Sequence, residues 1–421
     1  RRFVVIDTRE QPPELAVLQR EMPDVPVFAG AIPDAVIEQG GNWVVSPGIA
    51  LDHPVVVRAL AAGATVCGDI DLFMGAAEAP VVGITGSNAK STVTALLGEM
   101  AAAAGLNVGV GGNLGVPALD LLAPDRELHV LELSSFQLER AASLGLAVAT
   151  VLNVSADHLD RHGSLQQYHQ AKHRIFRGCA HAVVNRDDPL TLPLVGAETA
   201  VTSWRLKEPE LHGFGLRQID GQEWLCLGFD ALLTVEELGI QGRHNVGNVL
   251  AALALGQAAG LPMAAMQSAA RSFSGLPHRC QLVAEHGGVR FVNDSKGTNV
   301  GATRAALLGF GAGRNVILIA GGVGKGQDFR PLCQPLQASG KALVLIGEAA
   351  GQIADAVGDL LPIQRASDMP DAVRRAAACA AAGDVVLLSP ACASFDMFSG
   401  YPARGDAFVR AVAALREGVD A

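Results

Sequence analysis

Short apolar runs that end in small or polar residues recur along the chain, and longer stretches rich in alanine and leucine separate them. The short runs have the length of buried strands, and the stretches between them have the length of helices. Strands that alternate with helices form parallel sheets whose two faces the helices cover. The pattern therefore predicts an α/β fold. The runs that carry this prediction lie at 81–84, 107–110, 129–133, 148–153 and 182–185.

The distribution of these runs divides the chain into three expected domains. Residues 1–69 contain strand-like runs at 3–6 and 43–45 and predict a partial Rossmann-like N-terminal domain. Residues 70–275 predict a central domain of the P-loop ATPase type, with a parallel sheet, a strand-rich stretch at 223–240 and an apolar helix opened by 242–248. Residues 276–421 predict a C-terminal Rossmann-like domain. Its expected strands are 289–293, 316–320, 343–346 and 385–388.

Composition narrows the class of protein. The chain has 421 residues, which exceeds what one hydrophobic core usually serves, and its 48 glycines suit the many turns of an α/β enzyme. A net charge of −10 and the absence of a long Lys/Arg run argue against a nucleic-acid partner. The seven cysteines have no CxxC or zinc spacing, so we expect reduced thiols in a cytoplasmic protein. We expect neither a signal peptide at the start nor a membrane span in the apolar run 249–266.

The most informative segment is 83–92, with the sequence GITGSNAKST, which joins an apolar strand to an apolar helix. A turn at a helix N-terminus offers backbone N–H groups and the positive end of the helix dipole to phosphate oxygens. Lys90 adds a positive charge, and Ser91 or Thr92 offers a hydroxyl to magnesium. Ala89 departs from the P-loop pattern, because a glycine normally precedes the lysine. An ordinary Gly/Ser turn remains the alternative for this segment alone.

Polar side chains follow several predicted strands, where ligands of α/β sheets bind. Asp7, Thr8 and Arg9 end the first run and are expected to meet a ribose, base or phosphate, unless they only form a turn. Glu132 follows a strand beside the P-loop and is a candidate magnesium ligand, with capping of the next helix as the alternative.

The loop 153–160 places an amide, two carboxylates and His158 together. This density favours a metal or phosphate site over a solvated loop. Lys172 lies on an expected amphipathic helix, and composition alone predicts that it is a surface lysine.

These segments together resemble the Mur ligase family, and the resemblance spans nearly the whole chain. No single segment is decisive, but ten of them in this order are highly specific. They are ITGSNAKST at 84–92, GGNLGVPALD at 111–120, LELSSFQLE at 131–139, LNVSADHLDRH at 152–162, AKHRIF at 171–176, GRHNVGN at 242–248, SGLPHR at 274–279, NDSKGTN at 293–299, GGVGKG at 321–326 and SPACASFDMF at 389–398.

The resemblance implies ATP-dependent ligation of D-glutamate to UDP-N-acetylmuramoyl-L-alanine through an acyl phosphate, in peptidoglycan precursor synthesis. It implies two magnesium ions, held by Ser91, Thr92, Glu132, His158 and a carbamylated Lys172. Lys90, Lys172, His158 and Lys296 are the implied catalytic residues. The implied ATP-binding residues are Gly86, Ser87, Asn88, Ala89, Lys90, Ser91, Thr92, Asn245, Asn248, Arg279, Asp294 and Lys296. Because these groups come from two domains, we expect the site to assemble on domain closure.

The resemblance also implies two further binding sites in a monomeric protein. The UDP substrate would meet Asp7, Thr8, Arg9, Asn113, Ser134 and Gln137, and the incoming glutamate would meet Thr298, Lys325, Ser394, Phe395 and Tyr401. Phe395 and Tyr401 depart from the family pattern, which has a smaller aliphatic residue and a phenylalanine there. The chain also opens at what resembles the second strand of the family's first domain, so the glycine-rich turn for UDP is missing.

Three alternatives remain open at this stage. Another Mur or folylpolyglutamate-type ligase is disfavoured by the segments LELSSFQLE and SPACASFDMF. A P-loop switch that hydrolyses ATP without ligation is disfavoured by Arg279, Lys296 and Lys325, which lie outside the P-loop domain. A protein disabled by loss of the first strand is the third alternative.

Overall fold

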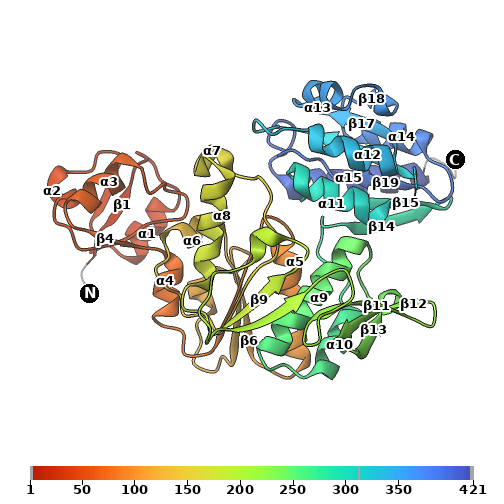
Figure 1. Cartoon of the computed structure of the whole chain (residues 1–421). Coiled ribbons are helices and arrows are strands. Elements are labelled where there is room, and N and C mark those ends of the chain that lie inside the picture. Colours follow the sequence, from red (N-terminus) through yellow and green to blue (C-terminus); the bar gives the residue numbers. More distant parts are fainter. Residues whose placement is uncertain (1–2, 312, 418–421) are drawn as a thin grey trace.

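The computed structural model describes residues 3–311 and 313–417, which form three α/β domains in the order of the chain (Figure 1). The N-terminal domain lies to one side of the central domain, and the C-terminal domain lies on the other side (Figure 1). Among the described residues, no helix is both long enough and apolar enough to cross a membrane.

The N-terminal domain contains two separate parallel pairs of strands, β1 with β2 and β3 with β4. A small core of Ile37, Ala59 and Ala64 lies between its helices and strands. The first strand begins later than predicted, because Phe3 and Val4 lie outside it and Asp7 is its last residue. The elements are β1 Val5–Asp7, α1 Leu15–Glu21, β2 Val27–Ala29, α2 Asp34–Ile37, β3 Asn42–Val44, α3 Pro54–Ala61 and β4 Thr65–Cys67. Helix α4 Asp69–Met74 follows and packs on the central domain, because its Ile70 and Phe73 share a core with Val81 of that domain.

The central domain is built on a nine-stranded sheet with the order β13-β12-β11-β10-β9-β8-β5-β7-β6. Its strands run parallel from β6 to β11, and β12 and β13 continue it as antiparallel strands. The strands are β5 Val81–Thr85, β6 Val108–Gly112, β7 Leu128–Glu132, β8 Val148–Val151, β9 His181–Asn185, β10 Ala200–Trp204, β11 Phe214–Ile219, β12 Gln222–Leu227 and β13 Asp230–Thr234. The helices are α5 Lys90–Ala103, α6 Ser135–Arg140, α7 Leu159–His162, α8 Leu165–His173, α9 Arg243–Ala258 and α10 Met263–Ser272.

Alternate residues of the buried strand β5 serve two different cores. Val82 and Ile84 belong to the core shared with α5, α9 and α10, whereas Val81 belongs to the core on the opposite face of the sheet. Side chains of a strand alternate between the two faces, so a strand covered on both sides reads as a continuous apolar run. This arrangement fixes the end of β5, and hence the P-loop, between two packed layers.

The C-terminal domain has a six-stranded sheet with the order β14-β15-β19-β16-β17-β18, in which only the pair of β14 with β15 is antiparallel. The predicted strands 289–293 and 385–388 match β15 and β19 residue for residue. The strands are β14 Gln281–His286, β15 Val289–Asn293, β16 Val316–Gly321, β17 Gly340–Ile346, β18 Ile363–Arg365 and β19 Val385–Leu388. The helices are α11 Val300–Phe310, α12 Cys333–Ser339, α13 Ala350–Val357, α14 Met369–Cys379 and α15 Tyr401–Glu417.

Short 3-10 helices connect several of these elements. They lie at Ala118–Leu121, Arg174–Phe176, Pro189–Thr191, Val235–Glu237, Arg330–Leu332 and Gly358–Leu360. The predicted strand-rich stretch 223–240 contains β12 and β13 but changes to one of these helices after Thr234.

Candidate functional site

The P-loop leaves the end of β5 at Thr85 and enters α5 at Lys90, as its sequence predicts. Ala89 has a φ of 68°, in the left-handed region that glycine enters without steric cost. The departure from the P-loop pattern therefore preserves the backbone shape and places a strained alanine in the turn.

Two lysines point at the same part of this turn. Lys90 Nζ donates to the carbonyl oxygens of Gly86 at 2.8 Å and Ser87 at 3.1 Å, and Lys172 Nζ donates to that of Gly86 at 2.7 Å. Burial lowers the pKa of Lys90, and it lowers the pKa of Lys172 well below its usual range, with the Lys90 charge adding to the latter shift. The expectation from composition that Lys172 is a surface residue is wrong, because its exposed fraction is 1%. It lies one helical turn after the buried Tyr168 and extends over that ring.

Glu132 ends β7 with both carboxylate oxygens engaged. Asn113 Nδ2 donates to Oε1 at 2.7 Å, and the Ser91 hydroxyl donates to Oε2. Arg279 Nη2 donates to Ser91 Oγ at 2.6 Å. The alternative role of Glu132 as a helix cap is wrong, because Ser134 caps α6 and accepts from Gln137 N. Buried carboxylate and hydroxyl oxygens in contact are hard donors that suit magnesium.

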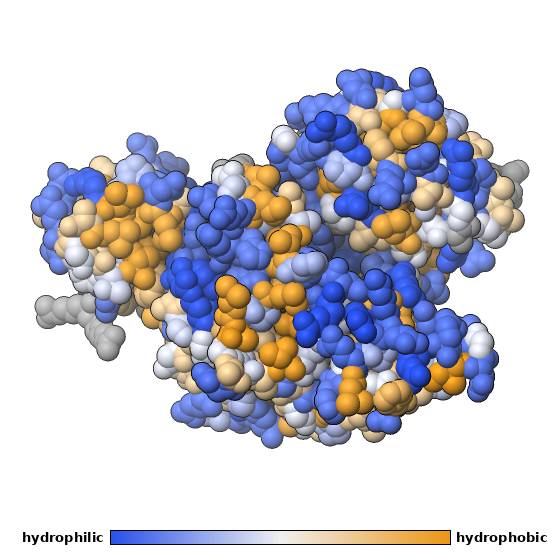
Figure 2. Space-filling view, in the orientation of Figure 1, coloured by the Kyte–Doolittle hydropathy of each residue, from blue (hydrophilic) through white to orange (hydrophobic). Residues whose placement is uncertain are grey.

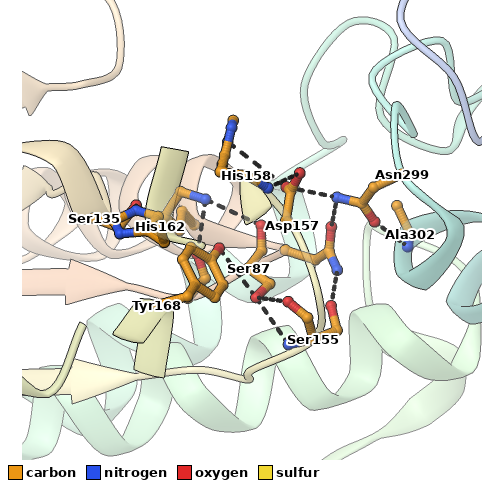
Figure 3. Close-up of polar contacts among 12 residues, drawn as sticks. Ser87, Ser135, Ser155, Asp157, His158, His162, Tyr168, Asn299 and Ala302 are labelled. Atoms are coloured by element: carbon orange, nitrogen blue, oxygen red, sulfur yellow. Dashed lines mark hydrogen bonds and ion pairs between the residues drawn. The ribbon is translucent and has the colours of Figure 1, made fainter. Parts of the chain in front are cut away.

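The loop after β8 lies against the P-loop (Figure 3). Asn153 Oδ1 accepts from Asn88 N at 2.8 Å, and Asn153 Nδ2 donates to Asn88 O at 3.1 Å. Asp157 and His158 form an ion-pair contact of 3.7 Å, and the His158 ring meets Phe136 edge to face. In the described part of the chain, no three His, Cys, Asp or Glu side chains together form a metal site. A metal at this loop would need oxygens from the P-loop, from substrate or from a modified lysine.

Residues of the C-terminal domain lie across the cleft from the P-loop. Arg279 lies between His278 and Cys280, which have φ values of 62° and 49°, so the linker turns sharply on both sides of the guanidinium. Lys296 Nζ lies 4.1 Å from the centre of the Tyr401 ring, and burial lowers its pKa to about 8. Asp294 accepts from Ser389 Oγ at 2.7 Å, and burial raises its pKa to about 6.

The predicted glutamate-binding residues converge in the same place. Thr298, Lys325, Ser394, Phe395 and Tyr401 all line one cleft with the P-loop. Ser394 is buried, and its hydroxyl has no hydrogen-bond partner among the described residues. The Phe395 side chain is 74% exposed at the rim.

The start of α9 lines another part of the cleft. Asn245 Nδ2 donates to Gln241 O at 2.7 Å, and Asn248 Nδ2 donates to Asn245 Oδ1 at 2.9 Å. His244, which precedes Asn245, is half-buried, but both of its ring nitrogens are buried and have no hydrogen-bond partner among the described residues. Burial lowers its pKa to about 4. Sequence reasoning missed His244, although it stands inside the quoted segment GRHNVGN.

The cleft has a volume of about 570 Å³ and lies between the central and C-terminal domains, where Figure 2 shows a hydrophilic surface. It brings together most of the predicted site residues. Those that line it are Ser87, Asn88, Ala89, Lys90, Ser91, Thr92, Asn113, Glu132, Ser134, His158, Lys172, Asn245, Asn248, Arg279, Asp294, Lys296, Thr298, Lys325, Ser394, Phe395 and Tyr401. Tyr168, Trp204, His244 and Asn299 also line it and were not predicted.

A few predicted residues lie elsewhere. In the N-terminal domain, the Asp7 carboxylate accepts from the Arg9 guanidinium at 2.6 and 2.9 Å. Asp7, Thr8 and Arg9 do not line the cleft. Gln137 completes the cap of α6 and donates to Asp69 Oδ2 at 3.1 Å. Gly86 contributes its carbonyl oxygen beneath the cleft rather than to its lining.

Comparison with known families matches three successive models. Residues 1–68 match the Mur ligase MurD-like N-terminal domain, residues 84–256 the Mur ligase middle domain, and residues 278–392 the glutamate ligase domain of Mur ligases.

Individual relatives cover nearly all of the chain. It is 54% identical to the UDP-N-acetylmuramoylalanine–D-glutamate ligases of Pseudomonas fluorescens and Pseudomonas aeruginosa, over 98% of this chain and 93% of each relative. Among solved structures, MurF ligase from Thermotoga maritima in complex with ADP is similar in fold, with a TM-score of 0.60 at 18% identity, over 91% of this chain and 99% of that one.

Proposed function

The chain belongs to the Mur ligase family, and from this premise we propose that it ligates D-glutamate to UDP-N-acetylmuramoyl-L-alanine with ATP, in peptidoglycan precursor synthesis. One observation carries the proposal: 54% identity to ligases of that name over 98% of the chain. We further propose domains at 1–69, 70–275 and 276–421, a monomer, and a cytoplasmic location without membrane or nucleic-acid partners.

The proposed first step activates the acceptor. An oxygen of the substrate carboxylate attacks the γ-phosphorus of ATP, the bond to the β,γ-bridging oxygen breaks, and ADP leaves. Lys90 and the P-loop amides, with Arg279 and Lys296 from across the cleft, would hold the phosphates in line and offset their charge. Gly86, Ser87, Asn88 and Ala89 supply the turn, Asn245 and Asn248 would contact the nucleotide, and Asp294 would support Lys296 and Arg279 at the phosphates.

Magnesium, when bound, neutralises phosphate charge and orients the attack. Ser91, Thr92 and Glu132 would hold one ion, because the hydroxyl of Ser91 and the carboxylate of Glu132 already touch. His158 and Lys172 would hold the second. Lys172 fits this role only after its neutral amine adds carbon dioxide and releases a proton, which gives an anionic carbamate. Its burial supports this step, because burial favours the neutral amine.

The proposed second step forms the amide. The amine of D-glutamate attacks the acyl carbon, the bond to phosphate oxygen breaks, and phosphate leaves as nitrogen loses a proton. Lys325, Thr298 and Ser394 would bind the carboxylates of the glutamate, and Phe395 and Tyr401 would shape its pocket. Asn113, Ser134 and Gln137, with Asp7, Thr8 and Arg9 of the N-terminal domain, would bind the UDP substrate.

The test is phosphate release from ATP and magnesium with UDP-N-acetylmuramoyl-L-alanine and either D-glutamate, L-glutamate or no amino acid. Release that requires D-glutamate supports the proposal. Equal release without any amino acid would instead indicate an ATPase switch, and release with L-glutamate alone would indicate another amide ligase. No release under any condition would contradict the ligase proposal for this chain.

A further inference from the structure

Asn299 joins the C-terminal domain to two loops of the central domain through one side chain (Figure 3). Its Nδ2 donates to Asn88 Oδ1 in the P-loop at 3.2 Å and to Asp157 Oδ2 at 3.0 Å. Its Oδ1 accepts from Ala302 N at 2.8 Å and so caps helix α11. The residue is 5% exposed. An asparagine side chain has two N–H donors and one carbonyl acceptor, and all three groups are engaged.

Helix α11 approaches the central domain closely at both of its ends. A Cβ atom on Gly301 would lie 2.7 Å from Ser155 Oγ, and a Cβ atom on Gly309 would lie 2.2 Å from His244 Nδ1. Helices α11 and α9 pack against each other, and Figure 1 shows α11 on the side of its domain that faces the central domain. Asn299 therefore lies where this contact reaches the P-loop.

The two partners of Asn299 stand at the centre of the candidate site. Asn88 is fixed by Asn153 through paired hydrogen bonds, and Asp157 accepts from the backbone N–H of His158 at 3.0 Å. On the other side, Lys296 and Thr298 precede Asn299 in the same short segment. A fixed amide at Asn299 thus sets where Lys296 lies relative to the P-loop and to His158.

We propose that Asn299 is a positioning residue that couples closure of the C-terminal domain to the alignment of the P-loop with the His158 loop. This inference rests on the proposed ligase function. It assigns Asn299 no contact with the reacting atoms; the residue acts through Asn88, Asp157 and the segment that carries Lys296.

The test compares Asn299→Asp with Asn299→Ser in the full chain. Both replacements retain an oxygen that can cap α11, so the thermal midpoint should stay within about 2 °C of the parent protein. Both variants lose the two amide N–H groups that donate to Asn88 and Asp157. In Asn299→Asp the new carboxylate also repels the carboxylate of Asp157. We expect kcat for D-glutamate-dependent phosphate release to fall at least about tenfold in both, more in Asn299→Asp, with the KM for ATP changed less than kcat.

A double-mutant cycle separates the contact of Asn299 with Asp157 from the capping of α11 by Asn299. In Asp157→Asn the new amide can donate to an aspartate at 299, so Asn299→Asp should lower kcat much less in that background than in the parent.

Small-angle scattering gives a second readout. A non-hydrolysable ATP analogue with magnesium should compact the parent chain and compact Asn299→Asp less.

Two results would overturn the proposal: parental kcat in Asn299→Asp, or an equal fall of kcat in both backgrounds together with parental compaction. A parent protein without D-glutamate-dependent release would count against the ligase function instead. In that case the scattering comparison still decides whether Asn299 controls closure.

Discussion

Lys90 and Lys172 donate to the same carbonyl oxygen, that of Gly86, at 2.8 and 2.7 Å. The two lysine amines share one neutral acceptor in a buried turn, so it costs free energy to keep both of them protonated. The balance favours a neutral amine at Lys172, whose pKa burial lowers most. A neutral amine is a nucleophile, whereas an ammonium group is not.

We predict that Lys172 reacts with carbon dioxide. Protein incubated with ¹³C-bicarbonate should show a carbamate carbon signal in its NMR spectrum, and Lys172→Arg should lack it. Because the carbamate would orient the second metal, Lys172→Arg should also lower kcat by about a hundredfold or more. The exposed Lys207→Arg is the matched control. A signal that persists in Lys172→Arg would assign the carbamate to another lysine.

His244 should make stability depend on pH in the acid range. Its pKa is lowered by burial from 6.5 to about 4, so between these values the unfolded chain binds a proton that the folded chain does not. The free energy of unfolding should therefore fall as pH decreases from 6.5 to 4, by about 3 kcal/mol from this group.

The measurement is urea unfolding at several pH values with His244→Leu. Because both ring nitrogens lack partners, leucine removes the titration without breaking a hydrogen bond. His286→Leu, at an exposed position, controls for histidine loss in general. An unchanged slope in His244→Leu would contradict the prediction.

Ala89→Gly should stabilise the protein. Glycine adopts a φ of 68° without steric strain. The free energy gained by removing this strain should exceed the entropic cost of a more flexible unfolded chain, so we expect the free energy of unfolding to rise by about 0.5–1 kcal/mol. Calorimetry measures the change. Ala103→Gly, at the end of α5, is expected to have the opposite sign, because helical glycine destabilises. Destabilisation by both replacements would show that Ala89 is not strained.

Ser394→Ala should weaken binding of D-glutamate. The buried hydroxyl has no partner in the described structure, so its removal breaks no internal hydrogen bond and should leave the thermal midpoint nearly unchanged. A hydrogen bond to a carboxylate is worth about 1.5–3 kcal/mol, so the KM for D-glutamate should rise at least about tenfold. The KM for ATP should not change. The exposed Ser399→Ala serves as the control, and a parental KM in Ser394→Ala would exclude the contact.

Local pattern predicted the strands that lie fully inside one layered core. β19 matches the prediction because it is a continuous, fully buried apolar run, and β15, which pairs with it, matches because its last three residues are buried. β2 and β18 were not predicted, because each has only three residues, too few for a pattern. The equally short β1 and β3 match the predicted runs 3–6 and 43–45 only in part. Phe3 was assigned to a strand for its hydrophobicity, yet it is exposed.

The candidate site shows the same limit. Lys90 comes shortly after β5 and Glu132 is the last residue of β7, and these two strands are neighbours in one sheet, so the proximity of the two residues follows from topology. The burial of Lys172, in contrast, depends on how α8 packs against the P-loop, and the roles of His244 and Asn299 depend on how a second domain docks. No local spacing reports these contacts.

The close approach of α11 restricts how its sequence can change. Gly301 and Gly309 lack side chains because atoms of another domain fill the space, as Ser155 and His244 do here. These positions are therefore constrained by a partner that the C-terminal domain does not contain. A library of substitutions on α11 should tolerate bulk on the faces that contact solvent and reject it at these two glycines, even where the C-terminal domain itself folds unchanged.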